Sequence, residues 1–114
     1  MTETNRQILL ASRPAGWVEE ANFKLVETPV PQIADGQVLV RNHFLSLDPY
    51  MRGRMNDAKS YAAPVNLGDV MVGGTAGEVV ASKEPKFAVG DRVVGYLGWQ
   101  LYGVSDGAML MKVD

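Results

Sequence analysis

Hydrophobic and polar positions alternate along this chain in short stretches separated by Gly and Pro, a pattern typical of β-strands. The alternation is clearest over residues 37–47, where Val38, Val40, Asn42 and Phe44 fall on one face of the expected strand. The same pattern predicts further strands over residues 6–12, 22–28, 69–82, 92–97 and 108–113. No segment has a long helical period. The spacing of the strands therefore predicts one small, mainly β domain, built as a barrel or a sandwich.

A short helix is predicted in the segment that begins at Asp48 and ends near Met55. Asp is a favoured N-cap residue, and Pro49 suits the first helical position because the missing N–H has no partner there in any case. We expect one or two helical turns. Residues 56–68 are predicted to form a loop, and the glycines that bound residues 103–107 predict a turn.

Charge and hydropathy exclude several classes of partner. Eleven basic and thirteen acidic residues give a net charge of -2, which argues against a nucleic-acid or anionic-membrane partner. No apolar run approaches the roughly 20 residues of a membrane-spanning helix. The first residues lack the basic head and long apolar stretch of a secretory signal. We therefore expect a cytoplasmic protein that binds neither nucleic acid nor membranes.

Metal and thiol chemistry is not expected. The chain has no Cys and a single His, His43. Disulfides, thiolate catalysis and cysteine-ligated zinc are thereby excluded, and one histidine cannot build a multi-histidine metal site. His43 lies in an alternating stretch, so we expect it to be half-buried or on the surface.

The glycine-rich residues 72–80 have two interpretations. They resemble a dinucleotide-binding loop only superficially, because that fingerprint needs G-x-G-x-x-G between a strand and a helix. Here the spacing differs, and the residues that follow favour a strand. One interpretation is a bulge or bend where two backbones approach closely. The other is that the missing side chains leave room for a ligand.

Two tyrosines are candidate site residues. A tyrosine hydroxyl donates a hydrogen bond to a carbonyl or a developing oxyanion, and both Tyr50 and Tyr61 lie beside expected loops. Alternatively, Tyr50 and the two neighbouring methionines only pack against the domain while Arg52 and Arg54 meet solvent. The residues alone leave both interpretations open.

Several motifs, in this order along the chain, resemble those of one enzyme family. They are D-P-Y-M-R at residues 48–52, G-G-T-A-G-E-V-V at 73–80, G-D-R-V-V-G at 90–95 and L-G-W-Q at 97–100. This combination resembles the zinc-independent medium-chain dehydrogenase/reductases, in the branch of prostaglandin reductases, plant alkenal double-bond reductases and bacterial curcumin-reductase-like enzymes. The resemblance extends over essentially the whole chain.

The resemblance implies a fold and a domain organisation. Residues 1–114 would form a GroES-like, partly open β-barrel, which is the N-terminal catalytic domain of such enzymes. Family members are about three times as long, because a Rossmann domain that holds most of NADP(H) follows this region. Since that domain is absent from the chain, we expect the isolated chain to be inactive. The zinc ligands of zinc-dependent relatives have no counterparts here, so no metal is implied.

The resemblance also implies an activity. The parent enzyme would pass a hydride from NADPH to the β-carbon of an α,β-unsaturated ketone or aldehyde, a small-molecule substrate. By position, Pro49 and Tyr50 would border the nicotinamide. Tyr50, Tyr61 and Gly74 would line the substrate side, and Tyr61 would donate to the developing negative charge. Quinone reduction with the same cofactor, or a stand-alone GroES-like binding module, are the alternatives.

Self-association is a further expectation. A barrel without its returning segment would expose unpaired strand edges and apolar surface, which favour pairing with another chain. We expect a symmetric homodimer, because two-fold pairs are the commonest closed assembly. Trp99, Leu101 and Tyr102 are expected to contribute to the exposed surface.

Overall fold

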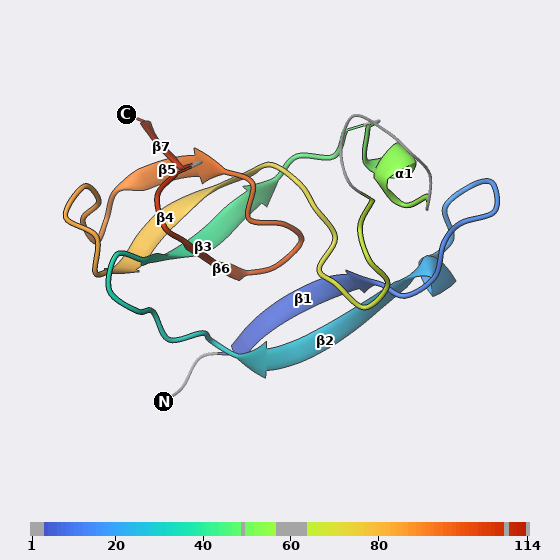
Figure 1. The fold of residues 1–114 in the computed structure, drawn as a ribbon, viewed down its shortest axis with the longest axis horizontal. Coiled ribbons are helices and arrows are strands. Elements are labelled where there is room, and N and C mark those ends of the chain that lie inside the picture. Colours follow the sequence, from blue (N-terminus) through green and yellow to red (C-terminus); the bar gives the residue numbers. More distant parts are fainter. Residues whose placement is uncertain (1–3, 49, 57–63, 109, 114) are drawn as a thin grey trace.

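The structure, a computed structural model, describes residues 4–48, 50–56, 64–108 and 110–113. In these residues the chain is mainly β, as predicted, with one short α-helix and one 3-10 turn (Figure 1). The elements in chain order are β1 (Thr4–Leu10), η1 (Glu20–Asn22), β2 (Phe23–Pro29), β3 (Val38–Leu45), α1 (Tyr50–Arg54), β4 (Thr75–Ser82), β5 (Arg92–Gly95), β6 (Tyr102–Ser105) and β7 (Met111–Val113).

The strands form two antiparallel sheets. β1 and β2 make a two-stranded ribbon, and the larger sheet has the order β6-β3-β4-β5-β7. Figure 1 shows the ribbon lying beside the larger sheet, with α1 near the end of β1. Among the described residues the sheets stay open and do not close into a barrel. The predicted GroES-like fold is confirmed in its partly open form.

Backbone and side-chain hydrogen bonds join the ribbon to the larger sheet. The Ile8 N–H donates to the Trp99 carbonyl at 2.8 Å, and an isolated bridge pairs Gln7 with Gln100. Beyond this bridge the side chain of Asn5, which is fully buried, continues the pairing. Its Oδ1 accepts the backbone N–H of Tyr102 at 2.9 Å. Its Nδ2 donates to the Tyr102 carbonyl and to Gln100 Oε1, each at 3.2 Å.

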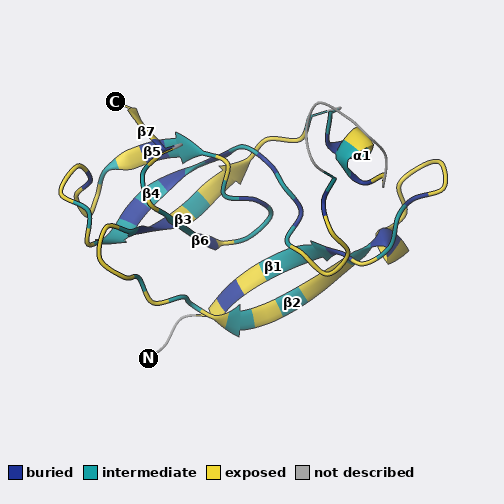
Figure 2. Ribbon diagram, viewed as in Figure 1, coloured by how far each residue is buried: buried dark blue, intermediate teal, exposed yellow. Residues whose placement is uncertain are grey.

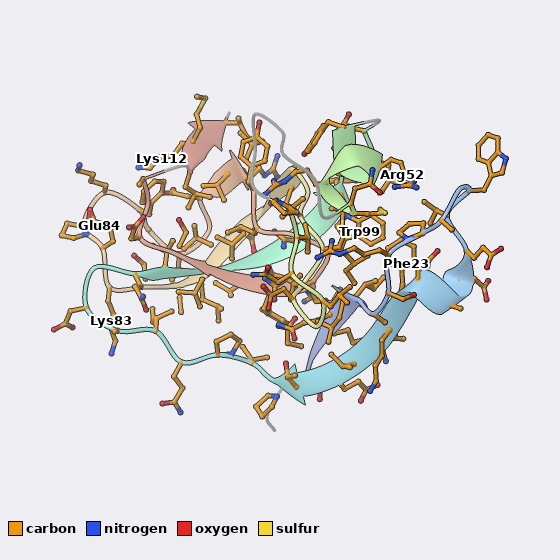
Figure 3. All side chains as sticks on the ribbon, turned by 45° about the vertical axis from the view of Figure 1, so that its right-hand side comes forward. Phe23, Arg52, Lys83, Glu84, Trp99 and Lys112 are labelled. Atoms are coloured by element: carbon orange, nitrogen blue, oxygen red, sulfur yellow. The ribbon has the colours of Figure 1, made fainter. Side chains whose placement is uncertain are left out.

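Two clusters of buried side chains form the core. The first lies on the larger sheet and consists of Val38, Val40, Val79, Phe87, Val93 and Leu110. The second lies between the ribbon and α1 and consists of Leu10, Met51, Met55, Val65 and Met71. Figure 2 shows the corresponding alternation of buried and intermediate residues along β4, whereas most of the ribbon is partly or fully exposed. Phe23 and Trp99 stack beside the second cluster with 5.3 Å between ring centroids (Figure 3).

Two sequence predictions are wrong in detail. Residues 69–82 do not form one bent strand, because only Thr75–Ser82 pairs within the larger sheet. The preceding residues instead bond to β1, with Met71 N–H donating to the Ile8 carbonyl at 3.0 Å. Residues 103–107 are not simply a turn, because β6 extends to Ser105. The other predicted strands are present with shifted ends.

Gly103 explains why the second prediction failed. A Cβ atom on Gly103 would lie 2.9 Å from the Cβ of Leu97, so this glycine allows close packing within a strand rather than a turn. Tyr102 is also buried, which contradicts its expected place on an exposed junction. Leu101 is exposed there, as expected, and Trp99 is half-buried.

Candidate active site

A cavity of about 760 Å³ opens at one end of the larger sheet. The register places Leu45, Thr75 and Gly95 side by side across β3, β4 and β5, so the ends of these strands meet there. The start of β7 and the start of α1 complete the wall. The cavity is lined by residues 44–46, 48, 50, 74–76, 94–96, 108, 110 and 111.

Local hydrogen bonds connect the end of β3 to α1. The Ser46 N–H donates to the Gly74 carbonyl at 2.8 Å, which extends the pairing of β3 and β4 by one step. The Ser46 hydroxyl donates to the Asp48 carboxylate at 2.7 Å, and the Asp48 carbonyl accepts the N–H of Met51 at 3.1 Å. The predicted helical turn after Asp48 is thereby confirmed as α1.

The D-P-Y-M-R segment combines parts of both sequence interpretations. Met51 and Met55 are buried in the second core cluster, as packing alone would require. Tyr50 is half-buried, and its side chain both packs against this cluster and lines the cavity. Arg52 does not simply meet solvent, because it is half-buried and its guanidinium bonds to backbone carbonyls.

The glycine-rich segment also satisfies both interpretations, at different residues. A Cβ atom on Gly77 would lie 2.9 Å from the Cα of Asn42, so two backbones approach closely there. A Cβ atom on Gly74 would lie no closer than 3.7 Å to its nearest neighbour, Tyr96, and Gly74 has no positive φ angle. Packing and backbone geometry therefore do not require glycine at position 74. The absence of a side chain there widens the cavity.

The structure brings two of the predicted site residues together, because Tyr50 and Gly74 both line the cavity. Pro49 and Tyr61 lie outside the described residues. Sequence analysis did not identify Phe44 or Tyr96, exposed aromatic residues that also line the cavity. The signal that locates them is the strand register, which sets the ends of β3 and β5 on either side of β4.

The cavity is mainly apolar and carries little positive charge. Its described lining includes Asp48 but no Lys or Arg. Aromatic and aliphatic walls of this kind accept a flat, uncharged ring, whereas a phosphate group needs cations or backbone N–H groups from elsewhere. In the described chain, β4 follows Gly74 directly, so no helix begins there to receive a phosphate.

Other candidate groups lie outside the cavity. His43 is exposed, as predicted, and no group of three or more metal-ligating side chains occurs within the described part of the chain.

The pKa of Asp91 is lowered, mainly because its carboxylate accepts the backbone N–H of Ala88 at 2.8 Å, and also because Lys112 lies 3.3 Å away. Asp91 thus stabilises the turn of the G-D-R-V motif. None of the described helices is long and apolar enough to cross a membrane.

Comparison with known proteins identifies the family. Residues 6–113 match a family of domains described as the N-terminal domain of oxidoreductase. The chain belongs to this family. It is 52% identical over 111 residues to the NADPH-dependent curcumin reductase of Escherichia coli (strain K12), covering 97% of the chain and 32% of that protein. It is 33% identical over 106 residues to a 2-alkenal reductase (NADP(+)-dependent) of Nicotiana tabacum, covering 89% and 31%.

A solved structure supports the same relationship. The crystal structure of CurA from Vibrio vulnificus in complex with NADPH matches with a TM-score of 0.89 and 53% identity. The match covers 94% of this chain and 32% of that one. The expected resemblance to the curcumin and alkenal reductase branch is confirmed, and this oxidoreductase domain spans about a third of the length of the relatives.

Proposed function

We propose that this domain forms the substrate-facing part of an NADPH-dependent oxidoreductase that reduces the C=C bond of α,β-unsaturated ketones or aldehydes without a metal. The observation that carries the proposal is the cavity in which Tyr50 and Gly74 meet. The similarity to a curcumin reductase and a 2-alkenal reductase supports the substrate class, since both names denote conjugated carbonyl compounds.

The described lining of the cavity suits the nicotinamide end of the cofactor and an enone, both of which are flat. The lack of Lys and Arg in this lining implies that the phosphate groups of NADPH are held elsewhere. When bound, NADPH would supply the hydride for the β-carbon of the substrate, and the α-carbon would take up a proton from solvent to complete the reduction. Tyr50, together with Pro49, would then border the nicotinamide and orient it.

The chain's own residues would handle the charge that develops on the carbonyl oxygen. A tyrosine hydroxyl has an ordinary pKa of about 10, so it stays protonated at neutral pH and donates a hydrogen bond. We propose Tyr61 as this donor, because a positioned hydroxyl lowers the energy of a developing oxyanion. Gly74 would set the width of the substrate side, since any side chain there would project toward Tyr96.

The full-length protein that contains this domain tests the proposal. NADPH oxidation is followed with an alkenal, with curcumin, with a quinone and without an acceptor, and the products are identified by mass spectrometry. We expect turnover of the two conjugated carbonyl compounds. In their products the C=C bond should be reduced to a single bond and the carbonyl should be intact. Activity should not fall after dialysis against EDTA. Turnover of the quinone alone would replace the proposal with quinone reduction. No turnover of any acceptor would favour a binding module.

Two further expectations belong to the isolated chain. We propose that it neither binds NADPH measurably nor reduces enones, because the dinucleotide fingerprint is absent from its sequence. We also propose a symmetric homodimer, since β7 lies at an edge of the larger sheet with exposed residues. Calorimetry with NADPH and light scattering at two concentrations test these expectations.

A further inference from the structure

The helix that begins with Tyr50 is too short to be stable without contacts to the rest of the chain. α1 has five residues, Tyr50–Arg54, and one of them is Gly53. Helices shorter than about 12 residues are marginal in water, and glycine weakens a helix further. Tyr50 is the first residue of α1, so the contacts of α1 with the rest of the chain determine where the Tyr50 ring lies in the cavity.

The side chain of Arg52 joins α1 to other parts of the chain through several hydrogen bonds. Its Nη2 donates to the carbonyl of Pro14 at 3.1 Å and to that of Gly16 at 3.0 Å. Its Nε donates to the same Gly16 carbonyl at 3.2 Å. Its Nη1 donates to Oδ1 of Asn56 at 2.7 Å, one turn further along the chain. Figure 3 shows the Arg52 side chain extending from α1 next to the loop that joins β1 to η1.

The same loop bonds back to the segment after α1. Arg13, which is half-buried, donates from Nη1 to the carbonyl of Met55 at 2.9 Å and to that of Val65 at 3.1 Å. The loop and the helical segment are therefore tied in both directions. Each tie uses a guanidinium on one side and backbone carbonyls on the other.

We infer that Arg52 is a positioning residue, which fixes α1 against the β1–η1 loop and thereby sets the Tyr50 ring in the cavity. The effect of Arg52 on catalysis, through the position of Tyr50, rests on the proposed function. The bonds of Arg52 to the loop go to uncharged carbonyls, so the planar fork of donors matters more than the charge. Lysine keeps the charge but cannot bond several carbonyls in one plane.

The first test needs no catalytic activity. Tyrosine rings and methionine methyl groups are labelled in the 114-residue chain. NMR then records the contacts between the Tyr50 ring and the methionine methyl groups of the second core cluster. In Arg52→Lys we expect these contacts to weaken and exchange of the Met55 N–H, which bonds to the carbonyl of residue 52, to quicken about ten-fold. The Val79 N–H, in the larger sheet, should change less than about two-fold.

The control is Arg6→Lys, which makes the same chemical change at an exposed position. Arg6 lies on β1 and pairs with Glu27 at 3.7 Å, with both side chains 62% exposed. We expect no change in the contacts of Tyr50. Should Arg52→Lys fail to fold, Asn56→Ala removes a single acceptor of Arg52 and should shift the Met55 exchange rate in the same direction by a smaller factor.

The second test uses the full-length enzyme. Arg52→Lys should raise the KM for NADPH roughly ten-fold and change kcat less than about two-fold, because Tyr50 is proposed to orient the cofactor rather than to react. Unchanged contacts of Tyr50 and an unchanged KM would overturn the inference. So would faster exchange spread evenly over both core clusters, which indicates a purely structural role. If the wild-type enzyme does not oxidise NADPH, the proposed function fails and the NMR experiment alone decides the role of Arg52.

Discussion

Replacing Asn5 with alanine should destabilise the domain substantially. Asn5 is fully buried, and both ends of its amide group are used. Oδ1 accepts the Tyr102 N–H, while Nδ2 donates to the Tyr102 carbonyl and to Gln100. Asn5→Ala removes all three bonds and leaves the Tyr102 N–H without this acceptor.

The magnitude follows from these bonds. Removing the buried acceptor that the Tyr102 N–H uses costs about 1–3 kcal/mol, and the lost bonds from Nδ2 add about 1 kcal/mol. We therefore expect Asn5→Ala to lower the free energy of unfolding by about 2–4 kcal/mol. A domain of this size has a total stability of about 5–15 kcal/mol, so the loss is a substantial fraction.

Urea denaturation at 25 °C measures the change. Trp99 is stacked on Phe23 beside the joined ribbon, whereas Trp17 is 94% exposed, so the shift in tryptophan emission reports mainly on Trp99. The matched control is Asn66→Ala, at an exposed position, which should stay within about 0.5 kcal/mol of the wild type. A loss for Asn5→Ala as small as that of the control would refute the reasoning, because Tyr102 would then have found another acceptor at no cost.

Three other results are expected. Gly74→Ala should change the free energy of unfolding by less than about 1 kcal/mol, because a Cβ atom there meets no close neighbour. Gly77→Ala should lower it by about 3 kcal/mol or more, because a Cβ atom there meets the backbone of β3, and thermal melts of the two variants test the difference. In the full-length enzyme, Tyr61→Phe should lower kcat about 10- to 1000-fold, and Tyr50→Phe should instead raise the KM for NADPH; unchanged kcat in the first would exclude Tyr61 as the donor. The pKa of Asp91 is lowered, so its contribution to stability is complete above the ordinary value of 3.8 and is lost as the pH falls through the folded-state pKa. Thermal melts over this pH range should therefore show that acidification destabilises the wild type more than Asp91→Asn.

The alternation of side chains predicted most strands, most clearly where one face is buried, as in β4. The Asp-Pro pair likewise predicted α1, since both residues favour a helix start. The sequence could not show that residues 69–74 pass from β1 to the larger sheet, because Val-rich residues suit either partner. Nor could the sequence distinguish a glycine that allows close packing within a strand, such as Gly103, from a glycine in a turn.

The candidate site was predicted in part for a similar reason. Tyr50 and Gly74 were identified through motifs, but Tyr96 joins them only through the register of β4 and β5. The role of Arg52 left no trace in the sequence, because its partners in the loop are backbone carbonyls, which every residue possesses. Positions that act through shape or through the backbone thus need the structure.

The difference between Gly74 and Gly77 bears on how such enzymes diverge. A mutation at Gly77 forces a Cβ atom into the neighbouring strand, so it is removed by its effect on folding before any new activity can be selected. A mutation at Gly74 changes the shape of the cavity at little cost to stability. If Gly74 sets the width of the substrate side, as proposed, substrate range can drift between lineages one codon at a time at position 74, while the fold that presents it stays the same.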